Sequence, residues 1–438
     1  MNFFVLSTIR KSAIPDIHFS FIGDGTGEHA GEAAAAGEAA ASNCIISESI
    51  YAYLCKSKRT IETCNSDEWD ATKKFTNPYE FIHTVIPGQK CAISKLKPLS
   101  RSFYKMIEII KHCKLYPFQQ QQQQQETPIQ TFHLAEGPGG FIEAVAHIRG
   151  NRHDVYHGMT LVDERSAGCP GWNKSRSFLE RNPNVVIEYG ADGTGDLLSL
   201  SNYDACCAKY GRQGVQGDQG EQGGQGGQME FISADGGFDF SSDFNHQEVL
   251  AQNLIVAEVL YAISLQKYEG SFVLKIFDIF TKVTVDLLQL LCGVYDDVII
   301  FKPNTSRIAN SEKYVVCKRF NISDEGAHKA LIAKFRQFFI SLETNAHSGS
   351  KRSMGVSGIL RTERHSVQLL ARIEEINVLL GQQQIENIAT TVSIIQSKMY
   401  DRLESYKRSN VQKCIAWCEK YNIPYNKGVV STNTFIRS

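Results

Sequence analysis

The middle of the chain alternates short apolar runs with amphipathic segments. Seven apolar runs predict β-strands, at residues 131–136, 156–162, 184–189, 231–235, 271–277, 297–302 and 313–319. Helical periodicity lies between several of them, at residues 140–149, 245–266 and 282–291. Strands that alternate with helices favour an open, mostly parallel α/β sheet of the Rossmann-like type, with helices on both faces.

The last two predicted strands follow each other without a helix between them. A parallel pair of strands needs a long crossover connection, usually a helix, whereas antiparallel strands can follow each other directly. We therefore expect an antiparallel hairpin at the edge of the sheet. The predicted sheet has seven strands, of which the last is antiparallel.

Both ends of the chain depart from this alternating pattern. Helical periodicity at residues 328–342 and 365–413, with Ser- and Gly-containing breaks near 348–358, predicts a helical C-terminal extension. The first part of the chain has no clear period, and we interpret it as a small, partly helical extension. The predicted organisation is an N-terminal extension (1–75), a central domain (76–320) and a helical extension (321–438).

Three tracts of biased composition interrupt the chain. Residues 25–41 are rich in Ala, Gly and Glu, residues 119–125 are all Gln, and residues 211–228 are mostly Gly and Gln. They hold too few apolar side chains to offset the entropy of ordering them. We interpret them as surface insertions in loops, the second and third of which directly precede a predicted strand.

Composition narrows the class of protein. The 438 residues carry a formal net charge of −1, which disfavours a DNA-coating role, although RNA binding needs only one positive groove. The 12 cysteines form no CxxC pair and no zinc-type spacing, so no metal site is predicted, and their use fits a reducing compartment. Cys414 and Cys418 are interpreted as packing residues on a helix.

Neither a membrane span nor a targeting signal is predicted. The most apolar later stretch, residues 253–265, is broken by Glu258 and is too short to cross a bilayer. The apolar run at the start of the chain is too short for a signal peptide.

A glycine-rich turn follows the first predicted strand. It reads Glu136, Gly137, Pro138, Gly139, Gly140, Phe141. Such a turn lets a ligand approach the backbone closely, and bare amides at a helix N-terminus attract carboxylate or phosphate. Because the motif is not GxGxxG, a dinucleotide-binding fold is disfavoured. Taken alone, the turn is equally consistent with a purely structural role.

Two further positions at the same sheet edge are candidates for cofactor contacts. Asp192 follows the third strand, where a carboxylate can accept a hydrogen bond from the amine of adenine. Its structural alternative is a turn before Gly193. After the second strand, where nucleotide sites often place an acid for the ribose hydroxyls, the chain has Thr160. Asp163 or Glu164 could take that role instead.

Four charged residues lie where a packed core does not require them. Lys105 precedes the first strand, Asp235 ends the fourth, Lys275 lies inside the apolar fifth, and Glu312 precedes the seventh. A lysine in a buried strand is costly unless paired, and burial beside a second cation would lower its pKa and suit a general base. Each residue also has a structural explanation, such as a solvated stem, a turn or a surface charge.

The joint order of these residues resembles the FtsJ-like ribose methyltransferases, whose hallmark is a Lys-Asp-Lys-Glu tetrad. The resemblance covers about residues 75–320 and rests on the segments SRSFYKMIEI, FHLAEGPGGFIEA, FISADGGFD, GSFVLKIFD and KPNTSRIANSEKYVVCKRF. Within the family, TNPYEFIHT, PGWNKSRSFL and VIEYGADGTGDL look most like the Adrift-type branch, which includes cap-specific enzymes, and particularly like the enzymes of asfarvirus-type large DNA viruses.

The resemblance implies a catalytic tetrad and S-adenosyl-L-methionine as the methyl donor. Lys275 would be the general base for the 2′-OH, and Lys105 would lower its pKa and orient the hydroxyl. Asp235 would position Lys275 and lie near the donor, and Glu312 would hold the lysines. The donor would be bound by Thr160, Asp192, Asp235 and the residues of the glycine-rich turn.

The resemblance also implies RNA, in particular capped mRNA, as the substrate, because a 2′-hydroxyl distinguishes RNA from DNA. We expect no DNA or membrane partner, a cytoplasmic location (host cytoplasm or virion if the protein is viral), and a capping-machinery partner at the C-terminal helices. Two alternatives stay open: a methyltransferase for a small molecule or protein, and a non-catalytic RNA-binding or scaffold subunit. An intact tetrad argues against both.

Several basic and aromatic residues are candidates for RNA contacts. Two clusters of positive charge precede the first strand: Lys56, Lys58 and Arg59, then Lys90, Lys95, Lys97 and Arg101. Such runs are usually solvated faces, but the second leads into Lys105, and we interpret it as a phosphate track. Three aromatic residues could stack on a base or serve in packing: Trp172, Phe238 and Phe240.

Replacing both Lys95 and Lys97 with alanine tests the phosphate track. We expect weaker RNA binding and a flatter dependence of affinity on salt, because fewer counterions are released when fewer phosphates are contacted. Fluorescence anisotropy with a labelled RNA over a salt series measures both quantities. Binding that stays unchanged would remove the track.

Overall fold

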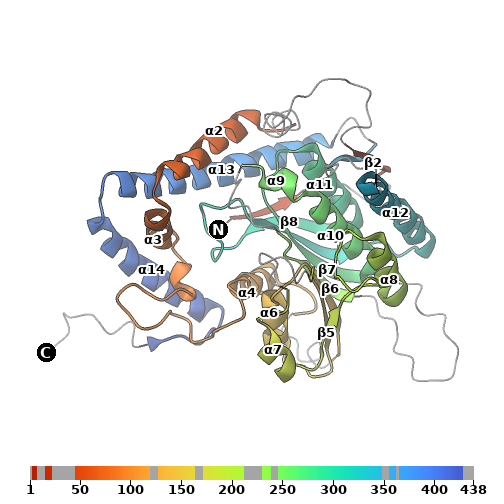
Figure 1. Cartoon of the computed structure of the whole chain (residues 1–438), viewed down its shortest axis with the longest axis horizontal. Helices are drawn as coiled ribbons and strands as arrows, with labels where there is room; N and C mark the ends of the chain where they lie inside the picture. Colours follow the sequence, from red (N-terminus) through yellow and green to blue (C-terminus); the bar gives the residue numbers. More distant parts are fainter. Residues whose placement is uncertain are drawn as a thin grey trace.

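The protein is described here as a computed structural model, which covers residues 2–6, 15–21, 45–118, 127–162, 171–211, 229–237, 245–347, 355–361 and 365–427. A central sheet is flanked by helices on both faces (Figure 1). This arrangement confirms the predicted α/β class. Apart from Gly211, the three tracts of biased composition lie outside the described residues.

The central sheet has eight strands in the order β1-β8-β9-β7-β6-β3-β4-β5. The pairs from β7 through β6, β3 and β4 to β5 are parallel, and β9 is antiparallel to both β7 and β8. The strands are β1 (Asn2–Leu6), β3 (Gln130–Leu134), β4 (Val155–Met159), β5 (Val185–Glu188), β6 (Met229–Ala234), β7 (Gln266–Ile276), β8 (Tyr295–Lys302) and β9 (Lys313–Phe320).

The edge of the sheet differs from the sequence-based expectation. The β8–β9 pair is antiparallel as predicted, but β8 is not an edge strand because β1 pairs with it, from Asn2↔Lys302 to Leu6↔Val298. Phe4 and Leu6 of β1 are buried, whereas Val5 is 48% exposed, which is the alternation of a strand with one covered face. The expectation of seven strands was wrong because this pairing joins segments almost 300 residues apart in the sequence.

Two hydrophobic cores lie on opposite faces of the sheet, and alternate strand residues point into each. Leu274 and Ile276 of β7 belong to the core under α10 and α11, whereas Val273 belongs to the core under α4 and α6. Because side chains alternate along a strand, Lys275 points to the α4 and α6 face. The helices around the sheet are α4 (Ser102–Cys113), α6 (Gly140–Arg149), α7 (Arg176–Arg181), α8 (Leu200–Tyr210), α9 (Gln247–Leu250), α10 (Gln252–Leu265), α11 (Lys282–Val294) and α12 (Glu325–His347).

The predicted long C-terminal helix is two helices, α13 (Val367–Gln396) and α14 (Asp401–Lys420). The chain turns between them, where Lys398 has a φ of 50° that a helix interior does not tolerate. Part of the predicted break upstream is a strand, β10 (Val356–Leu360), which pairs with β2 (Ile17–Phe21) in a separate two-stranded sheet.

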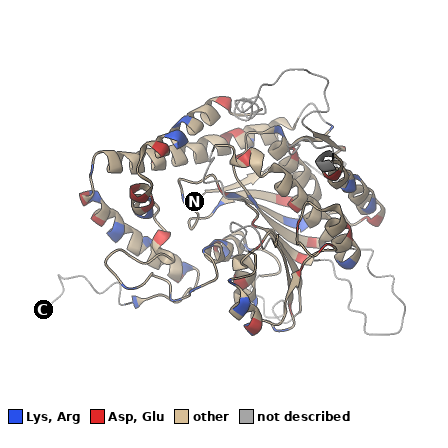
Figure 2. Cartoon of the chain, in the orientation of Figure 1, with Lys and Arg blue, Asp and Glu red and all other residues tan. Residues whose placement is uncertain are grey.

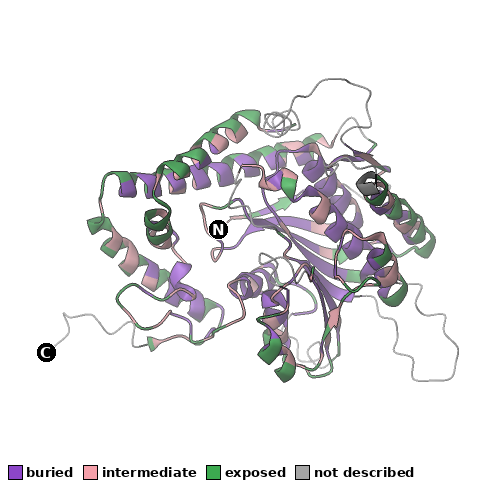
Figure 3. Ribbon diagram, in the orientation of Figure 1, coloured by how far each residue is buried: buried purple, intermediate pink, exposed green. Residues whose placement is uncertain are grey.

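The C-terminal helices pack on the N-terminal half of the chain. In Figure 1, α13 runs along α2 (Glu48–Arg59), and α13 and α14 both contact α3 (Ser66–Thr76). A short helix η1 (Thr60–Thr63) joins α2 to the segment before α3, and η2 (Glu80–Ile82) contacts α14. Figure 3 shows buried residues recurring along α13, whereas α2 and α3 are largely exposed or intermediate.

One buried carboxylate connects α14 to the helix that carries Lys105. Glu108 of α4 accepts hydrogen bonds from the Trp417 indole of α14 (3.2 Å) and from the backbone N–H groups of Asn304 (3.0 Å) and Thr305 (3.1 Å). A fully buried carboxylate is stable only with such donors. Glu108 therefore holds the loop before β9 against α4.

Among the described helices, none is long and apolar enough to cross a membrane.

Candidate active site

The four predicted catalytic residues converge at the carboxyl end of the parallel strands. Asp235 directly follows β6, and Lys275 is the penultimate residue of β7. Because β9 is antiparallel to β7, with Ile276 opposite Lys313, the residue before β9 returns to this end, and that residue is Glu312. Lys105 reaches the same place from the first turns of α4.

The four side chains form two ion pairs that lie side by side. The Lys105 Nζ atom lies 2.7 and 2.8 Å from the two carboxylate oxygens of Glu312. The Lys275 Nζ atom donates to the backbone carbonyl of Asp235 at 2.6 Å and lies 3.3 Å from its Oδ1 atom. Lys275 is only 12% exposed, so the strand lysine is buried and paired.

Tyr314 joins the two ion pairs, and the sequence analysis did not identify it. Its hydroxyl lies 3.2 Å from Oδ1 of Asp235 and 3.2 Å from Oε1 of Glu312, and as a single O–H donor it serves one of them at a time. Tyr314 is the register partner of Lys275 across β7 and β9 and is fully buried. Its position two residues after Glu312, on the same face of the strand, was the available sequence signal.

The expected lowering of the Lys275 pKa is wrong. Burial acts to lower the pKa of Lys275, but the carboxylates of Asp235 and Glu312 outweigh burial, and the pKa is raised. Lys105 shows the opposite result, because burial lowers its pKa further than Glu312 and Asp235 raise it. The sequence placed Asp235 and Glu312 near Lys275 as positioning groups, but it did not show that their charges exceed the effect of burial. Carboxylates stabilise an ammonium group.

The carboxyl groups around the lysines differ in protonation. Burial raises the pKa of Glu312, but Lys105 and Lys275 lower it more, and the pKa lies well below the ordinary value. Burial raises the pKa of Glu258 to about 8 and that of Glu136 well above its ordinary range. At neutral pH, Glu312 is therefore ionised, whereas Glu258 is largely protonated.

The glycine-rich turn forms the wall beside this cluster. Gly139 has a φ of 103°, which a residue with a side chain rarely adopts, and a Cβ atom on Gly140 would lie 2.2 Å from the hydroxyls of Ser100 and Ser102 at the start of α4. The turn therefore packs directly on the helix that carries Lys105. The sequence predicted free amides at the N-terminus of α6, but the amide of Phe141 is already bonded. Its N–H donates to Glu136 Oε1 at 2.5 Å.

Glu136 and Thr160 are two of the predicted cofactor contacts, and both are buried. Glu136 Oε2 is buried and has no hydrogen-bond partner within the described part of the chain. Thr160 is buried directly after β4, between Gly137 and Gly195. A Cβ atom added to Gly137 would lie 3.1 Å from the Thr160 Cγ2 atom, and one added to Gly195 would lie 2.1 Å from the Thr160 carbonyl oxygen. The glycines thus bring backbone segments into contact with Thr160, and the set Glu136, Gly137, Thr160 and Gly195 is called the cradle below.

Asp192 has the turn-forming geometry that was its structural alternative. Its Oδ1 atom accepts from the backbone N–H and hydroxyl of Thr194 (2.8 and 2.7 Å) and from the Asn202 amide (2.9 Å). These bonds outweigh desolvation and lower the pKa of Asp192. The loop that carries Asp192 continues to Gly195, which contacts Thr160. Asp192 itself is exposed, at the edge of the cradle.

The predicted basic clusters and aromatic residues lie in different environments. Lys58 is buried in a 2.9 Å ion pair with Asp278, so the first basic cluster is not one exposed face. The exposed lysines of the second cluster are Lys90, Lys95 and Lys97, and Figure 2 shows that Lys and Arg are mixed with Asp and Glu on the outer helices. Trp172 packs against Gly139 and Gly158. The predicted residues Asp163, Glu164, Phe238 and Phe240 lie outside the described residues.

Both cysteines on α14, Cys414 and Cys418, are buried, which confirms their interpretation as packing residues.

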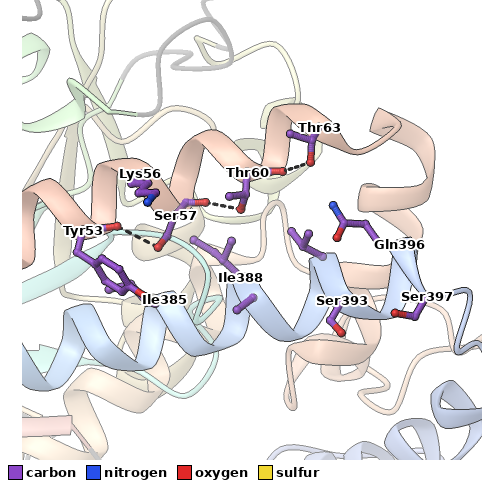
Figure 4. Close-up of a pocket in the computed structure, with 12 residues that line it drawn as sticks. Tyr53, Lys56, Ser57, Thr60, Thr63, Ile385, Ile388, Ser393, Gln396 and Ser397 are labelled. Atoms are coloured by element: carbon purple, nitrogen blue, oxygen red, sulfur yellow. Dashed lines mark hydrogen bonds between the residues drawn. The ribbon is translucent and has the colours of Figure 1, made fainter.

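A groove of about 480 Å³ lies elsewhere, with α2 and η1 on one side and α13 on the other. Figure 4 shows Tyr53, Lys56 and Thr60 on one side of it and Ile385 and Ile388 on the other. It contains none of the tetrad residues. The groove is therefore separate from the candidate active site.

Comparison with known families agrees with the site. A model of the FtsJ-like methyltransferases matches residues 98–320, which is half of the chain and includes all four tetrad positions. The chain belongs to the FtsJ-like methyltransferase family. This match confirms the family resemblance found in the sequence, and it covers the strands and turn that build the site.

Relatives of this FtsJ-like protein include cap-specific mRNA (nucleoside-2′-O-)-methyltransferase 1 of Mus musculus, 30% identical over 64% of this chain and 32% of that protein. The protein of the same name from Leishmania braziliensis is 35% identical over 42% of each chain. The chain thus spans about a third of the length of its mammalian relatives. A putative ribosomal RNA methyltransferase from Plasmodium falciparum superposes with a TM-score of 0.32 at 16% identity, covering 50% of this chain and 97% of that one.

Replacing Gly195 with alanine tests whether the cradle binds the methyl donor. The new Cβ would lie 2.1 Å from the Thr160 carbonyl oxygen, so the wall of the cradle must shift. We expect the KM for S-adenosylmethionine to rise at least about tenfold, with a smaller effect on the KM for RNA, since a misplaced wall weakens donor binding. Initial rates over a donor concentration series measure this change.

Gly193→Ala is the matched control for that substitution. Gly193 also has a positive φ, 77°, but its Cβ would have no neighbour within 4 Å, so only the backbone strain of ~1–2 kcal/mol is shared. Equal effects of the two substitutions on the donor KM would contradict the assignment of the cradle.

Proposed function

We propose that this protein transfers the methyl group of S-adenosyl-L-methionine to a ribose 2′-hydroxyl of RNA, at the first or second nucleotide of an mRNA 5′ cap. The observation that carries the proposal is the buried cluster of Lys105, Asp235, Lys275 and Glu312 beside the glycine-rich turn of an FtsJ-like domain. A binding-only protein has no need of two buried lysines with matched carboxylates, whose burial costs stability.

The residues of the cradle suit the methyl donor. The unpartnered Glu136 Oε2 is free to form a hydrogen bond with the donor, and the turn from Gly137 to Phe141 offers a surface with little side-chain bulk. Thr160 would line the ribose end, and Asp192 at the rim would accept from the adenine amine. When bound, S-adenosylmethionine supplies a methyl group on a positively charged sulfur, which makes the methyl carbon electrophilic.

The lysines act on the acceptor hydroxyl. Lys105 and Lys275 both reach the centre of the cluster, where their N–H groups would hold the 2′-oxygen in line with the methyl group. As the new oxygen–carbon bond forms, the carbon–sulfur bond of the donor would break and S-adenosylhomocysteine would leave as the neutral thioether. The 2′-OH proton must also leave, and we propose the neutral amine of Lys275 as its acceptor. Asp235 and Glu312 keep the two lysine side chains in place, and Tyr314 keeps the two carboxylates in place.

The RNA would reach the cluster along the exposed lysines before α4. Lys95 and Lys97 are solvent-exposed and precede Arg101 and Lys105 in the chain, as a phosphate track requires. Cap specificity is supported by the names of the relatives, although they are about three times longer than the matching region. We further propose that the protein belongs to the Adrift-type branch of the family and is most similar to the enzymes of asfarvirus-type viruses. We also propose that it acts in the cytoplasm and that α13 and α14 bind another protein of the capping machinery.

Methyl mapping tests the reaction and its acceptor. We expect labelled S-adenosylmethionine to transfer its methyl group to capped RNA in preference to uncapped RNA of the same sequence. Nuclease digestion should then release the label in a 2′-O-methylated cap-proximal nucleotide. Label on a base nitrogen would overturn the proposed reaction, and equal labelling of both RNAs would overturn cap specificity alone.

Substitution of Lys275 tests its role as the base. Lys275→Ala and Lys275→Arg should both lower kcat by about 10²–10⁴-fold, because alanine lacks the nitrogen and arginine cannot be deprotonated. The control is Lys267→Ala, which removes a lysine from the opposite end of β7, where it pairs with Glu230 at 2.6 Å. An arginine variant with nearly full activity would assign Lys275 a purely electrostatic role.

The pH dependence of kcat should follow the raised pKa of Lys275. The ammonium form cannot accept a proton, and a raised pKa keeps that form dominant at neutral pH. We therefore expect kcat to rise with pH from neutral into the alkaline range, as the neutral amine becomes populated. Single-turnover rates over a pH series would measure this rise, and a profile that falls from neutral to alkaline pH would contradict it.

A further inference from the structure

Two arginines meet at one buried carboxylate next to the catalytic cluster. Glu80, in η2, is 2% exposed, and its oxygens accept from Nε (3.0 Å) and Nη2 (2.7 Å) of Arg307. The Nη1 atom of Arg101 lies 3.7 Å from the same carboxylate, and its Nη2 donates to the carbonyl of Thr305 at 3.1 Å. The arginines come from segments more than 200 residues apart.

The charges at this point do not balance. Burial acts to raise the pKa of Glu80, but the two arginines bring it down to about 2, so Glu80 is ionised and offsets one of the two guanidinium groups. Burial and Arg101 lower the pKa of His83 to about 4, which leaves His83 neutral. The nearby Asp70 pairs with Lys73 at 2.5 Å, and Glu312 pairs with Lys105. One positive charge remains without a matching carboxylate.

The unmatched charge is accessible to a ligand. The side chains of Arg101 and Arg307 are 26% and 31% exposed, in contrast to the buried carboxylate beneath them. A guanidinium group has five N–H donors in a planar fork, and Glu80 takes only two of those on Arg307. The other donors on the two side chains can contact an anion from the solvent side, and a guanidinium fork matches phosphate geometry.

Both arginines are positioned next to the proposed acceptor site. Arg101 lies one helical turn before Lys105, so the two side chains share a face of the chain entering α4. Arg307 follows Ser306, whose hydroxyl donates to Glu312 at 3.0 Å. In RNA, the 2′-hydroxyl of each ribose is adjacent to a phosphodiester. An RNA with its 2′-oxygen at Lys105 and Lys275 therefore has a phosphate close to this arginine pair.

We propose that Arg101 and Arg307, held together by Glu80, form a clamp for the phosphodiester next to the acceptor ribose. The clamp rests on the proposed 2′-O-methyltransfer and adds a specific subsite to it. The shared carboxylate fixes the two guanidinium groups before RNA binds, which reduces the entropy lost on binding. Because it contacts the backbone, the clamp positions the ribose and does not select a base.

The test compares Arg307→Ala, Arg101→Ala and Arg307→Lys with a matched ion-pair variant, Arg336→Ala. Arg336 forms the same fork with Asp204, at 2.8 and 2.7 Å, between α12 and α8. The full-length variants are assayed for equilibrium binding of a capped RNA over a salt series and for the KM of RNA and of S-adenosylmethionine. Thermal unfolding of each variant reports the cost of losing an ion pair.

We expect each arginine-to-alanine change in the clamp to weaken RNA binding about tenfold or more and to lower the salt slope by about one phosphate contact, with the donor KM unchanged. Arg307→Lys should keep the salt slope but lose affinity, because lysine keeps the charge without the fork. RNA affinity and salt slope that match those of Arg336→Ala would overturn the clamp and leave a structural ion pair. Because binding is measured apart from turnover, a wild-type protein without methyl transfer would refute the proposed function separately.

Discussion

The structure depends on the balance of charge around a lysine buried in a β-strand. Lys275 can remain in β7 because Asp235 at the end of β6 and Glu312 before β9 supply negative charge, and Lys105 matches the second carboxylate. Removing any one member leaves a buried charge without its partner, which costs more than the intact set contributes. Burial also raises the pKa of two further acids, Glu136 and Glu258, which favours their neutral forms. The cluster is thus neutral as a whole while each lysine keeps a distinct affinity for protons.

The fold supplies this balance from four separate elements. The antiparallel placement of β9 beside β7 turns Glu312 back to the carboxyl end of the parallel strands, and the same register puts Tyr314 opposite Lys275. The loop that leads to Glu312 is anchored on Glu108 of α4, and Trp417 of α14 binds the same carboxylate. The C-terminal helices therefore support α4, which carries Lys105, as well as the outer surface of the protein. This connection explains how a long helical extension can be integral to the site.

The proposed cofactor side and the proposed RNA side of the cluster are built on different principles. On one side, glycines bring backbone within contact of backbone, as at Gly195 and Thr160, so that a narrow cradle forms without bulky side chains. On the other side, arginine and lysine side chains supply charge, with Glu80 holding Arg307 and Arg101 in place. A small donor needs a fitted wall, whereas a polyanion needs positive charge that stays accessible to solvent. The tetrad lies where the two surfaces meet.

The sequence alone determined the seven central strands, three of the helices between them, the glycine-rich turn and the four charged candidates, because periodicity and motifs are local properties of the chain. Helix 140–149 was predicted with the bounds of α6. The tertiary structure decided what depends on residues distant in sequence. It added β1 to the edge of the sheet, it divided the long C-terminal helix, and it placed Lys58 inside the protein. It also reversed the expected pKa shift of Lys275, because the number of carboxylates around a lysine is set by the approach of separate elements and not by its neighbours in the chain.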